Sequence, residues 1–135
     1  MEFVPFEIAK KLKEKGFTEC CLGYYTNSDI LHFNYTHKAG SKYTDCYLSH
    51  NLMPRDSVSG KFVDAPTISQ VLKWLRNEKE IYCLPHLDQS VDMWFGYVTR
   101  PKTCCVFVEY ISGSIYNTYE DAALDGIEYV LDNLI

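Results

Sequence analysis

The sequence predicts a single α+β domain, in which about three amphipathic helices pack on an antiparallel sheet. Its 135 residues suit one domain with one core. Helical periodicity occurs near the N-terminus, in the middle and at the C-terminus, and runs rich in β-branched and aromatic residues lie between. With 47% hydrophobic and 23% charged residues, the composition excludes a disordered, collagen-like or coiled-coil chain.

The first predicted helix runs from Pro5 to about Lys15. Proline pre-sets the φ angle of a first helical turn, and Gly16 supplies a left-handed stop. The apolar residues of this segment are Phe6, Ile8, Ala9 and Leu12, and its lysines are Lys10, Lys11, Lys13 and Lys15. The following segment, residues 17–26, has the composition of a strand.

Residues 30–63 are predicted to be loop-rich, with one or two short strands such as Lys42 to Leu48. Gly40, Pro54 and Gly60 interrupt the pattern. Long irregular segments in compact domains often carry function, so this segment is either a working surface or a plain surface insertion.

A capping box predicts the central helix. Thr67 can cap the helix while Gln70, three residues on, reaches back to its amide. The apolar residues that follow fit helical spacing at Ile68, Val71, Leu72 and Leu75, and Trp74 widens the apolar face.

Three further strands are predicted after this helix. Residues 80–85 form the first, and residues 93–99 and 103–110 form a hairpin around Arg100-Pro101-Lys102. Residues 86–92 connect them. Gly96 within the hairpin indicates a bulge or a close neighbour.

Thr118 is predicted to cap the last helix, and Asp121 favours its positive end. The predicted apolar side of this helix consists of Ala123, Leu124, Ile127, Val130, Leu131 and Leu134. Its acids, Asp121, Asp125, Glu128 and Asp132, recur at helical spacing on the opposite side. We therefore expect one side of the helix to pack on the sheet and the other to face water.

The net charge of -5 lies entirely in the second half of the chain. Residues 1–64 carry eight Lys or Arg and eight Asp or Glu, whereas residues 65–135 carry five and ten. The last helix has five acids and no base, although helix, three strands and helix is also the element order of a double-stranded-RNA-binding domain. Such domains need basic residues to contact phosphate, so we expect no nucleic-acid binding.

The first residues show neither a basic start nor an apolar run, and no stretch is long and apolar enough for a membrane span. We therefore expect a cytoplasmic protein that does not bind membranes. Its six cysteines are then reduced thiols, because a core of this size needs no disulfides. They are Cys20, Cys21, Cys46, Cys83, Cys104 and Cys105.

Two chemical sites can be assembled from the sequence. Cys46, His50, Cys83 and His86 form an acceptable zinc set, but their pairs lie far apart and Cys83 reads as a small buried strand residue. Cys46 with His50 and Asp45 could form a thiol nucleophile, but no cysteine visibly begins a helix that would lower its pKa. We therefore assign no catalytic residue, no cofactor and no metal ligand.

Aromatic residues make up 15% of the chain. Several tyrosines fall in the less regular half, namely Tyr24, Tyr25, Tyr35, Tyr43 and Tyr47. Tyrosine is favoured at protein interfaces, but it is equally common on half-buried sheet faces. Both interpretations stay open.

Four segments resemble a family of short uncharacterised proteins of Bacteroides-type gut bacteria and their phages and mobile elements. They are FVPFEIAKKLKEKGF at the start, CLGYYT at residues 21–26, APTISQVLKWLR at 65–76 and YEDAALDGIEYVLDNLI at 119–135. The resemblance covers most of the chain except about residues 30–63. It implies a cytoplasmic setting in a bacterium or phage, and it assigns no activity.

The sequence thus favours a non-enzymatic protein-interaction module. The basic first helix and the acidic last one offer complementary surfaces for self-association. The alternative is a small enzyme or metal-binding protein that uses the Cys and His residues of the loop-rich half.

Overall fold

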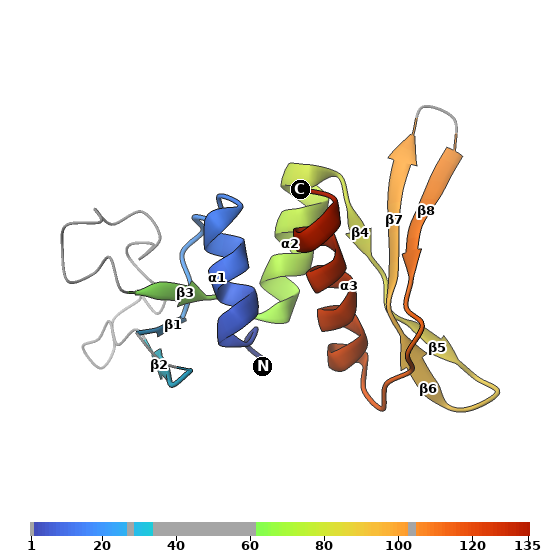
Figure 1. The fold of residues 1–135 in the computed structure, drawn as a ribbon, viewed down its shortest axis with the longest axis horizontal. Coiled ribbons are helices and arrows are strands. Elements are labelled where there is room, and N and C mark those ends of the chain that lie inside the picture. The colour runs from blue at the N-terminus through green and yellow to red at the C-terminus, as the bar shows by residue number, and fades with distance from the viewer. Residues whose placement is uncertain (1, 27–28, 34–61, 103–104) are drawn as a thin grey trace, which may run out of the picture. The chain divides into compact units, whose positions relative to one another are not determined.

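The computed structural model describes residues 2–26, 29–33, 62–102 and 105–135, and it shows a mixed α+β fold (Figure 1). The helices are α1 (Phe6–Glu14), α2 (Ile68–Lys79) and α3 (Tyr119–Asn133). The strands are β1 (Gly23–Tyr25), β2 (Leu31–Phe33), β3 (Val63–Ala65), β4 (Tyr82–Cys83), β5 (His86–Asp88), β6 (Met93–Phe95), β7 (Tyr97–Lys102) and β8 (Cys105–Ile111). All pairings between these strands are antiparallel, as predicted.

The chain groups into two compact units, residues 3–67 and residues 68–135, and each is described by itself. That residues 1–135 act as one domain stays a prediction.

The first unit contains α1 and a sheet in the order β2-β1-β3. As predicted, α1 begins directly after Pro5, and Gly16 follows it with a φ angle of 87°. The hydroxyl of Tyr25 donates to the carbonyl of Val4 over 2.7 Å. Because this donor is satisfied, Tyr25 is a structural residue of the first unit.

The second unit contains α2, α3, a sheet in the order β4-β7-β8 and the two-stranded sheet β5-β6. Helix α3 packs on the strands and α2 contacts α3, so the helices cover one face of the β4-β7-β8 sheet (Figure 1). Leu84 lies between β4 and β5, and its amide donates to the carbonyl of Tyr97, the first residue of β7, over 2.7 Å. This bond holds β7 against the segment that leads into the β5-β6 sheet.

Helix α3 begins as the sequence predicts. Thr118 is its N-cap, and its Oγ1 accepts a hydrogen bond from the amide of Asp121 over 3.1 Å. The helix buries small residues as well as large ones on its inner side, namely Ala122, Ala123, Gly126, Ile127, Val130 and Leu131. Small residues let a helix approach a sheet closely.

Helix α2 also begins at the predicted place, directly after Thr67, and it buries Ile68, Val71, Trp74 and Leu75. It ends before Glu80, whose φ angle of 55° is left-handed and incompatible with a continued helix.

Several predicted strand boundaries are wrong. The strand expected over residues 17–26 is only β1, and the one expected over residues 80–85 is only β4. Residues 86–88 form strand β5 instead of a connecting loop, and Arg100-Pro101-Lys102 belongs to β7 instead of a turn. The strand expected at Lys42 to Leu48 lies outside the described residues.

Candidate protein-contact surface

The sheet of the second unit has one face toward α3 and one face away from it. A Cβ atom on Gly126 of α3 would lie 3.4 Å from Val98 Cγ2 and 3.8 Å from the Cys83 side chain. A Cβ atom on Gly96 would lie 3.0 Å from the carbonyl oxygen of Ala122 in α3. Gly96, Val98 and Cys83 therefore face the helix.

Side chains alternate along a strand, so the neighbours of these residues point away from α3. Phe95 and Tyr97 flank Gly96, and Leu84 follows Cys83. The ring centroids of Phe95 and Tyr97 are 6.5 Å apart, which agrees with this assignment. Trp94 points the other way, toward α3, and its ring contacts that of Tyr119.

We call the side of the sheet turned away from α3 the outer face. It is defined by Leu84, His86, Phe95, Tyr97, Val108 and Ile111. The ring of His86 lies 4.3 Å from that of Tyr97 and 5.6 Å from that of Phe95. Tyr97 is the register partner of Ile111. A β-bulge interrupts the pairing after Val98, and beyond it Thr99 pairs with Val108, so Val108 lies on the same side of the sheet as Ile111 although the two are three residues apart. Thr99 itself is buried.

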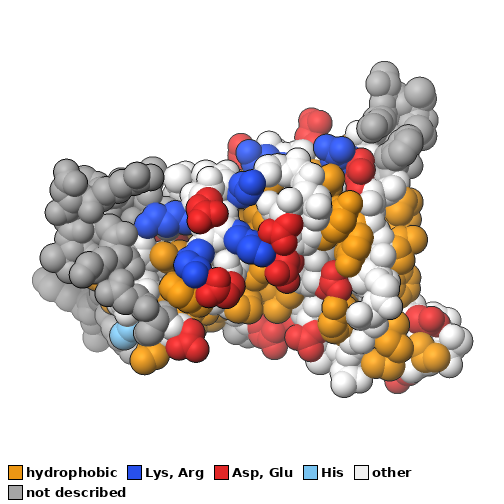
Figure 2. Space-filling view, in the orientation of Figure 1, with side chains coloured by type: hydrophobic (Ala, Val, Ile, Leu, Met, Phe, Trp, Pro, Cys, Tyr) orange, Lys and Arg blue, Asp and Glu red, His pale blue; other side chains and the backbone are white. Residues whose placement is uncertain are grey.

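The outer face is apolar and open to solvent. Leu84 is 47% exposed, Val108 45% and Ile111 57%, and Phe95 and Tyr97 are half-buried. Orange side chains gather along the β7 and β8 side of this unit and over the β5-β6 hairpin (Figure 2). None of the six residues is an acid, a lysine or an arginine. A contiguous apolar patch of this kind marks an interaction surface more often than an isolated exposed residue does.

The outer face was missed at the level of the sequence, although a signal for it exists. Trp94, Gly96 and Val98 alternate with Phe95 and Tyr97, so both sides of the strand are apolar. That pattern is typical of a strand covered on both faces. Among the described residues of this unit, helices cover only one face.

The candidate zinc set does not assemble where the structure describes it. Cys83 is buried toward α3, whereas His86 lies on the outer face, so the two side chains point to opposite sides. Cys46 and His50, like Asp45, lie outside the described residues. Within the described ranges, no group of three or more His, Cys, Asp or Glu could hold a metal ion.

Burial raises the pKa of the Cys83 thiol to about 12. The thiolate is the reactive form, so Cys83 should resist alkylation by iodoacetamide at neutral pH in the folded protein. Exposed Cys20 should react at a rate typical of a surface thiol. Peptide mass spectrometry after a timed reaction checks this, with the urea-unfolded chain as the control in which both cysteines react. Equal labelling of the two in the folded protein would contradict the buried position of Cys83.

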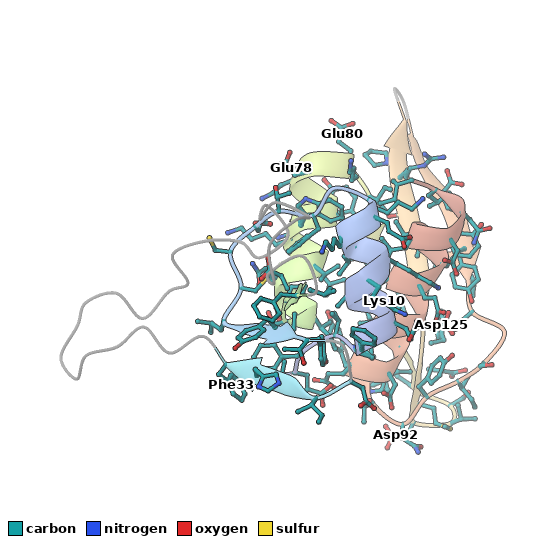
Figure 3. All side chains as sticks on the ribbon, turned by 60° about the vertical axis from the view of Figure 1, so that its left-hand side comes forward. Lys10, Phe33, Glu78, Glu80, Asp92 and Asp125 are labelled. Atoms are coloured by element: carbon teal, nitrogen blue, oxygen red, sulfur yellow. The ribbon has the colours of Figure 1, made fainter. Side chains whose placement is uncertain are left out.

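One acid of the predicted water-facing side has a different role. Asp125, which lies on α3 (Figure 3), is half-buried, and its Oδ1 accepts a hydrogen bond from the hydroxyl of Tyr110 over 2.7 Å. Its Oδ2 accepts a hydrogen bond from the hydroxyl of Tyr116. Tyr110 lies on β8 and Tyr116 on the segment before α3, so Asp125 links three elements of the second unit. The prediction that Asp125 faces water with the other acids is therefore wrong.

The two tyrosines bound to Asp125 are held in their neutral form. Burial and the hydrogen bond to Asp125 raise the pKa of Tyr110 to about 12. The hydrogen bond to Asp125, followed by burial, raises the pKa of Tyr116 to about 12. A phenol with so high a pKa is a poor proton donor at neutral pH, so this cluster favours a structural role.

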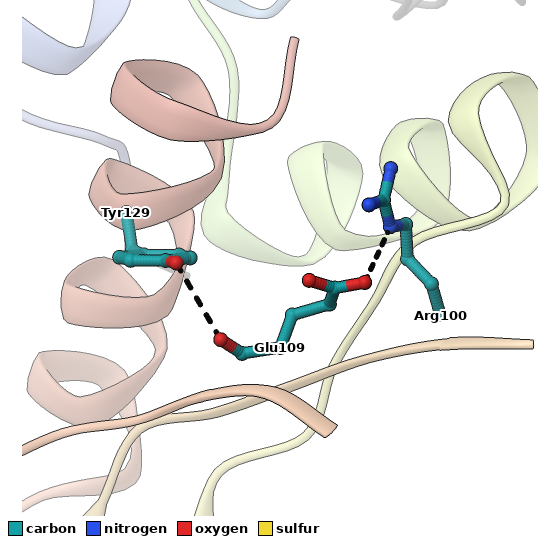
Figure 4. A network of polar contacts seen from close by, with 3 residues as sticks. All are labelled: Arg100, Glu109 and Tyr129. Atoms are coloured by element: carbon teal, nitrogen blue, oxygen red, sulfur yellow. Dashed lines mark hydrogen bonds and ion pairs between the residues drawn. The ribbon is translucent and has the colours of Figure 1, made fainter. Parts of the chain in front are cut away.

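A second polar network joins β7, β8 and α3 (Figure 4). The Nε atom of Arg100 donates to Glu109 Oε1 over 3.0 Å, and the hydroxyl of Tyr129 donates to the carbonyl of Glu109 over 3.4 Å. Arg100 also lines an open hollow with Lys79, Glu80 and Pro101. This hollow offers charges of both signs and little enclosure, which is unlike the concave, mostly apolar sites that bind small molecules.

The basic side of α1 is partly occupied within the first unit. Lys10 forms an ion pair with Glu7 over 2.9 Å and lies over the ring of Phe6. The Nζ atom of Lys13 donates to the carbonyl of Phe62 over 3.0 Å. These contacts leave less charge available for the self-association of α1 with an acidic helix.

Of the other tyrosines in the first half of the chain, the structure describes only Tyr24. Tyr24 is half-buried and stacks on His32 with ring centroids 5.4 Å apart. Tyr35, Tyr43 and Tyr47 lie outside the described residues.

Among the described residues, the longest and most apolar helices fall short of what crossing a membrane requires. Neither a protein-family model, nor a curated protein, nor a solved structure matches this chain.

Proposed function

We propose that the chain is a non-enzymatic protein-interaction module, which binds another protein or a second copy of itself through the outer face. The observation that carries the proposal is the exposed, largely apolar outer face built from Leu84, His86, Phe95, Tyr97, Val108 and Ile111. Covering such a surface removes apolar area from water and so stabilises a complex.

The make-up of the outer face supports this role. Aromatic side chains contribute a large contact area at a small entropic cost, and they are enriched at interfaces whose cores are depleted of charge. His86, Phe95 and Tyr97 supply three adjoining rings, and their mutual contacts hold them in place before any partner arrives.

The setting is part of the same proposal. We infer a cytoplasmic protein of a bacterium or its phage, because four of its segments resemble the family of short bacterial and phage proteins. The cysteines are expected to be reduced in that setting.

Affinity capture from the bacterium that encodes the chain tests the proposal, with three variants that each replace an exposed apolar residue by an acid. Ile111→Glu and Val108→Glu alter the outer face, and Leu22→Glu alters an exposed residue outside it. We expect a bound protein, or a second copy, whose recovery falls by roughly tenfold or more with both outer-face variants. Recovery with Leu22→Glu should match that of the wild type.

Substitutions at exposed positions should change the free energy of unfolding by no more than about 0.5 kcal/mol. Recovery is compared only between variants whose stability matches that of the wild type. Analytical ultracentrifugation of the same proteins identifies the case in which the partner is a second copy. A set of bound proteins that is identical for the wild type and both outer-face variants would contradict the proposal.

A further inference from the structure

A second exposed surface lies where the β5-β6 hairpin meets the start of α3. Leu87 and Trp94 are cross-strand partners, so their side chains share the side of the hairpin opposite His86 and Phe95. The ring of Trp94 meets that of Tyr119 edge to face, with centroids 5.4 Å apart. Leu87 is 40% exposed and Tyr119 39%, so water reaches this surface. We call it the hairpin–helix surface.

Backbone contacts hold this surface in one shape. The amides of Trp94 and Tyr116 each donate to the carbonyl of the other over 2.7 Å, which fixes the segment before α3 against β6. In the hairpin turn, Asp88 Oδ1 accepts from the amide of Ser90 over 3.0 Å and from its hydroxyl over 2.6 Å. A rigid surface loses little entropy when a partner binds.

The charge around the hairpin–helix surface has one sign. Asp92 ends the hairpin turn, and Glu120 and Asp121 follow Tyr119 in the first turn of α3. Residues 80–99 and 108–135 contain no Lys or Arg at all. None of the three carboxylates forms an ion pair with a residue that the structure describes. The field at this surface therefore favours cations.

We propose that the hairpin–helix surface binds a basic segment of another protein, in which an apolar side chain lies between Lys or Arg residues. The apolar side chain would contact Leu87, Trp94 and Tyr119, and the cations would lie near Asp92, Glu120 and Asp121. Tryptophan and tyrosine are enriched in binding hot spots, and complementary charge speeds association.

A second copy of this chain fits the surface less well. Its basic segment is α1, whose apolar residues Ile8, Ala9 and Leu12 are buried. Lys10 and Lys13 already have partners. Phe6 is the one apolar residue of α1 that is partly exposed, and Lys10 lies over its ring, so α1 offers little apolar area beside its charges. Exposed ion pairs alone contribute little.

The test uses an amphipathic synthetic peptide of Lys and Leu, together with its counterpart that carries Glu at every Lys position. Isothermal titration calorimetry with the full chain should show saturable binding of the Lys peptide that weakens as salt is raised, and no binding of the Glu peptide. Two indole N–H signals are expected in the NMR spectrum, from Trp74 and Trp94. Only that of Trp94 should move, because Trp74 is buried.

Charge-matched variants locate the binding. Asp92→Asn and Asp121→Asn should each weaken the Lys peptide by about threefold, and Leu87→Gln by about tenfold. Asn tolerates the left-handed φ of 55° at position 92. Glu78→Gln removes one acid at the opposite end of the same unit (Figure 3) and should leave the affinity unchanged.

A loss with Glu78→Gln as large as that with Asp121→Asn would overturn the proposal, since it would show attraction by net charge alone. Equal binding of the Glu peptide, no binding of either peptide, or a shift of the Trp74 signal alone would also overturn it. The inference shares with the proposed function only the premise that the chain binds proteins. Ile111→Glu should leave peptide binding intact, so the outer face and the hairpin–helix surface can fail separately.

Discussion

Replacing Gly96 by Ala is expected to lower the free energy of unfolding by about 1–3 kcal/mol, the usual cost of overpacking a close contact. The new Cβ atom would lie 3.0 Å from the carbonyl oxygen of Ala122 and 3.4 Å from the amide nitrogen of Gly126. Both atoms belong to the backbone of α3, so relief requires moving the helix from the sheet. The Gly96 backbone has little freedom to move instead, since its amide donates to Ser112 Oγ and its carbonyl accepts from the Ser112 amide.

Gly126→Ala is the matched control for this prediction. There the new Cβ atom would meet only side chains, Val98 at 3.4 Å and Cys83 at 3.8 Å. Alanine in place of glycine within a helix is favourable by up to about 1 kcal/mol. Urea unfolding followed by circular dichroism should therefore show a lower midpoint for Gly96→Ala and an equal or higher one for Gly126→Ala. The reverse order would refute the close packing of α3 on the sheet.

Replacing Asp125 by Ala is expected to lower the free energy of unfolding by about 2–3 kcal/mol. Hydrogen bonds to a charged group contribute about 1.5–3 kcal/mol each, and partial exposure of both tyrosines reduces their sum. Tyr110 and Tyr116 would lose their shared acceptor, and the segment before α3 would lose its link to the helix. Asp125→Asn keeps one acceptor oxygen. Its free energy of unfolding, measured by the same urea experiment, should therefore lie between those of Asp125→Ala and the wild type. Equal stability of all three proteins would mean that the hydroxyls find water at no cost.

The same cluster makes stability depend on pH in the alkaline range. A phenol with a raised pKa keeps its proton in the folded protein where the unfolded chain, with its ordinary pKa near 10, has lost it. The stability from Tyr110 and Tyr116 is therefore complete below pH 10 and is lost as the pH rises toward about 12. Urea unfolding of the wild type at a series of pH values should show this fall in the free energy of unfolding. The double variant Tyr110→Phe with Tyr116→Phe should show a smaller fall.

The helices could be predicted from the sequence because their signals are local. Thr118 caps α3, the left-handed Gly16 stops the helical conformation after α1, and the apolar spacing after Thr67 predicts α2. Each signal lies within a few residues of the element that it predicts.

The strand boundaries depend on partners that are distant in sequence. Leu87 is in a strand because Trp94 pairs with it, and residues 86–92 alone read as a polar turn. Pro101 suggests a turn because proline lacks an amide hydrogen. In the structure it lies in β7 beyond the end of β4, which pairs only with Val98 and Thr99, so no ladder bond to β4 is lost.

The candidate surfaces were not predicted for a related reason, although residues 94–98 are apolar on both sides of the chain and so carry a signal for the outer face. Cys83 in β4 faces α3, where it lies near Gly126, whereas His86 in β5 lies on the outer face beside Tyr97, and only the tertiary fold separates the two. Helical spacing likewise placed Asp125 with the other acids, whereas Tyr110 and Tyr116, brought close by the hairpin and the preceding segment, decide its role.

The central claim is that the outer face contacts a protein, and a photo-crosslinking amino acid at position 111 tests it most directly. Ile111 is 57% exposed, more than either of the other aliphatic residues of that face. Irradiation of cells that carry the chain should give one adduct of discrete mass, either with another protein or with a second copy. The same amino acid at Lys73, an exposed position of α2, should give none. No adduct from position 111, or the same pattern from both positions, would contradict the account.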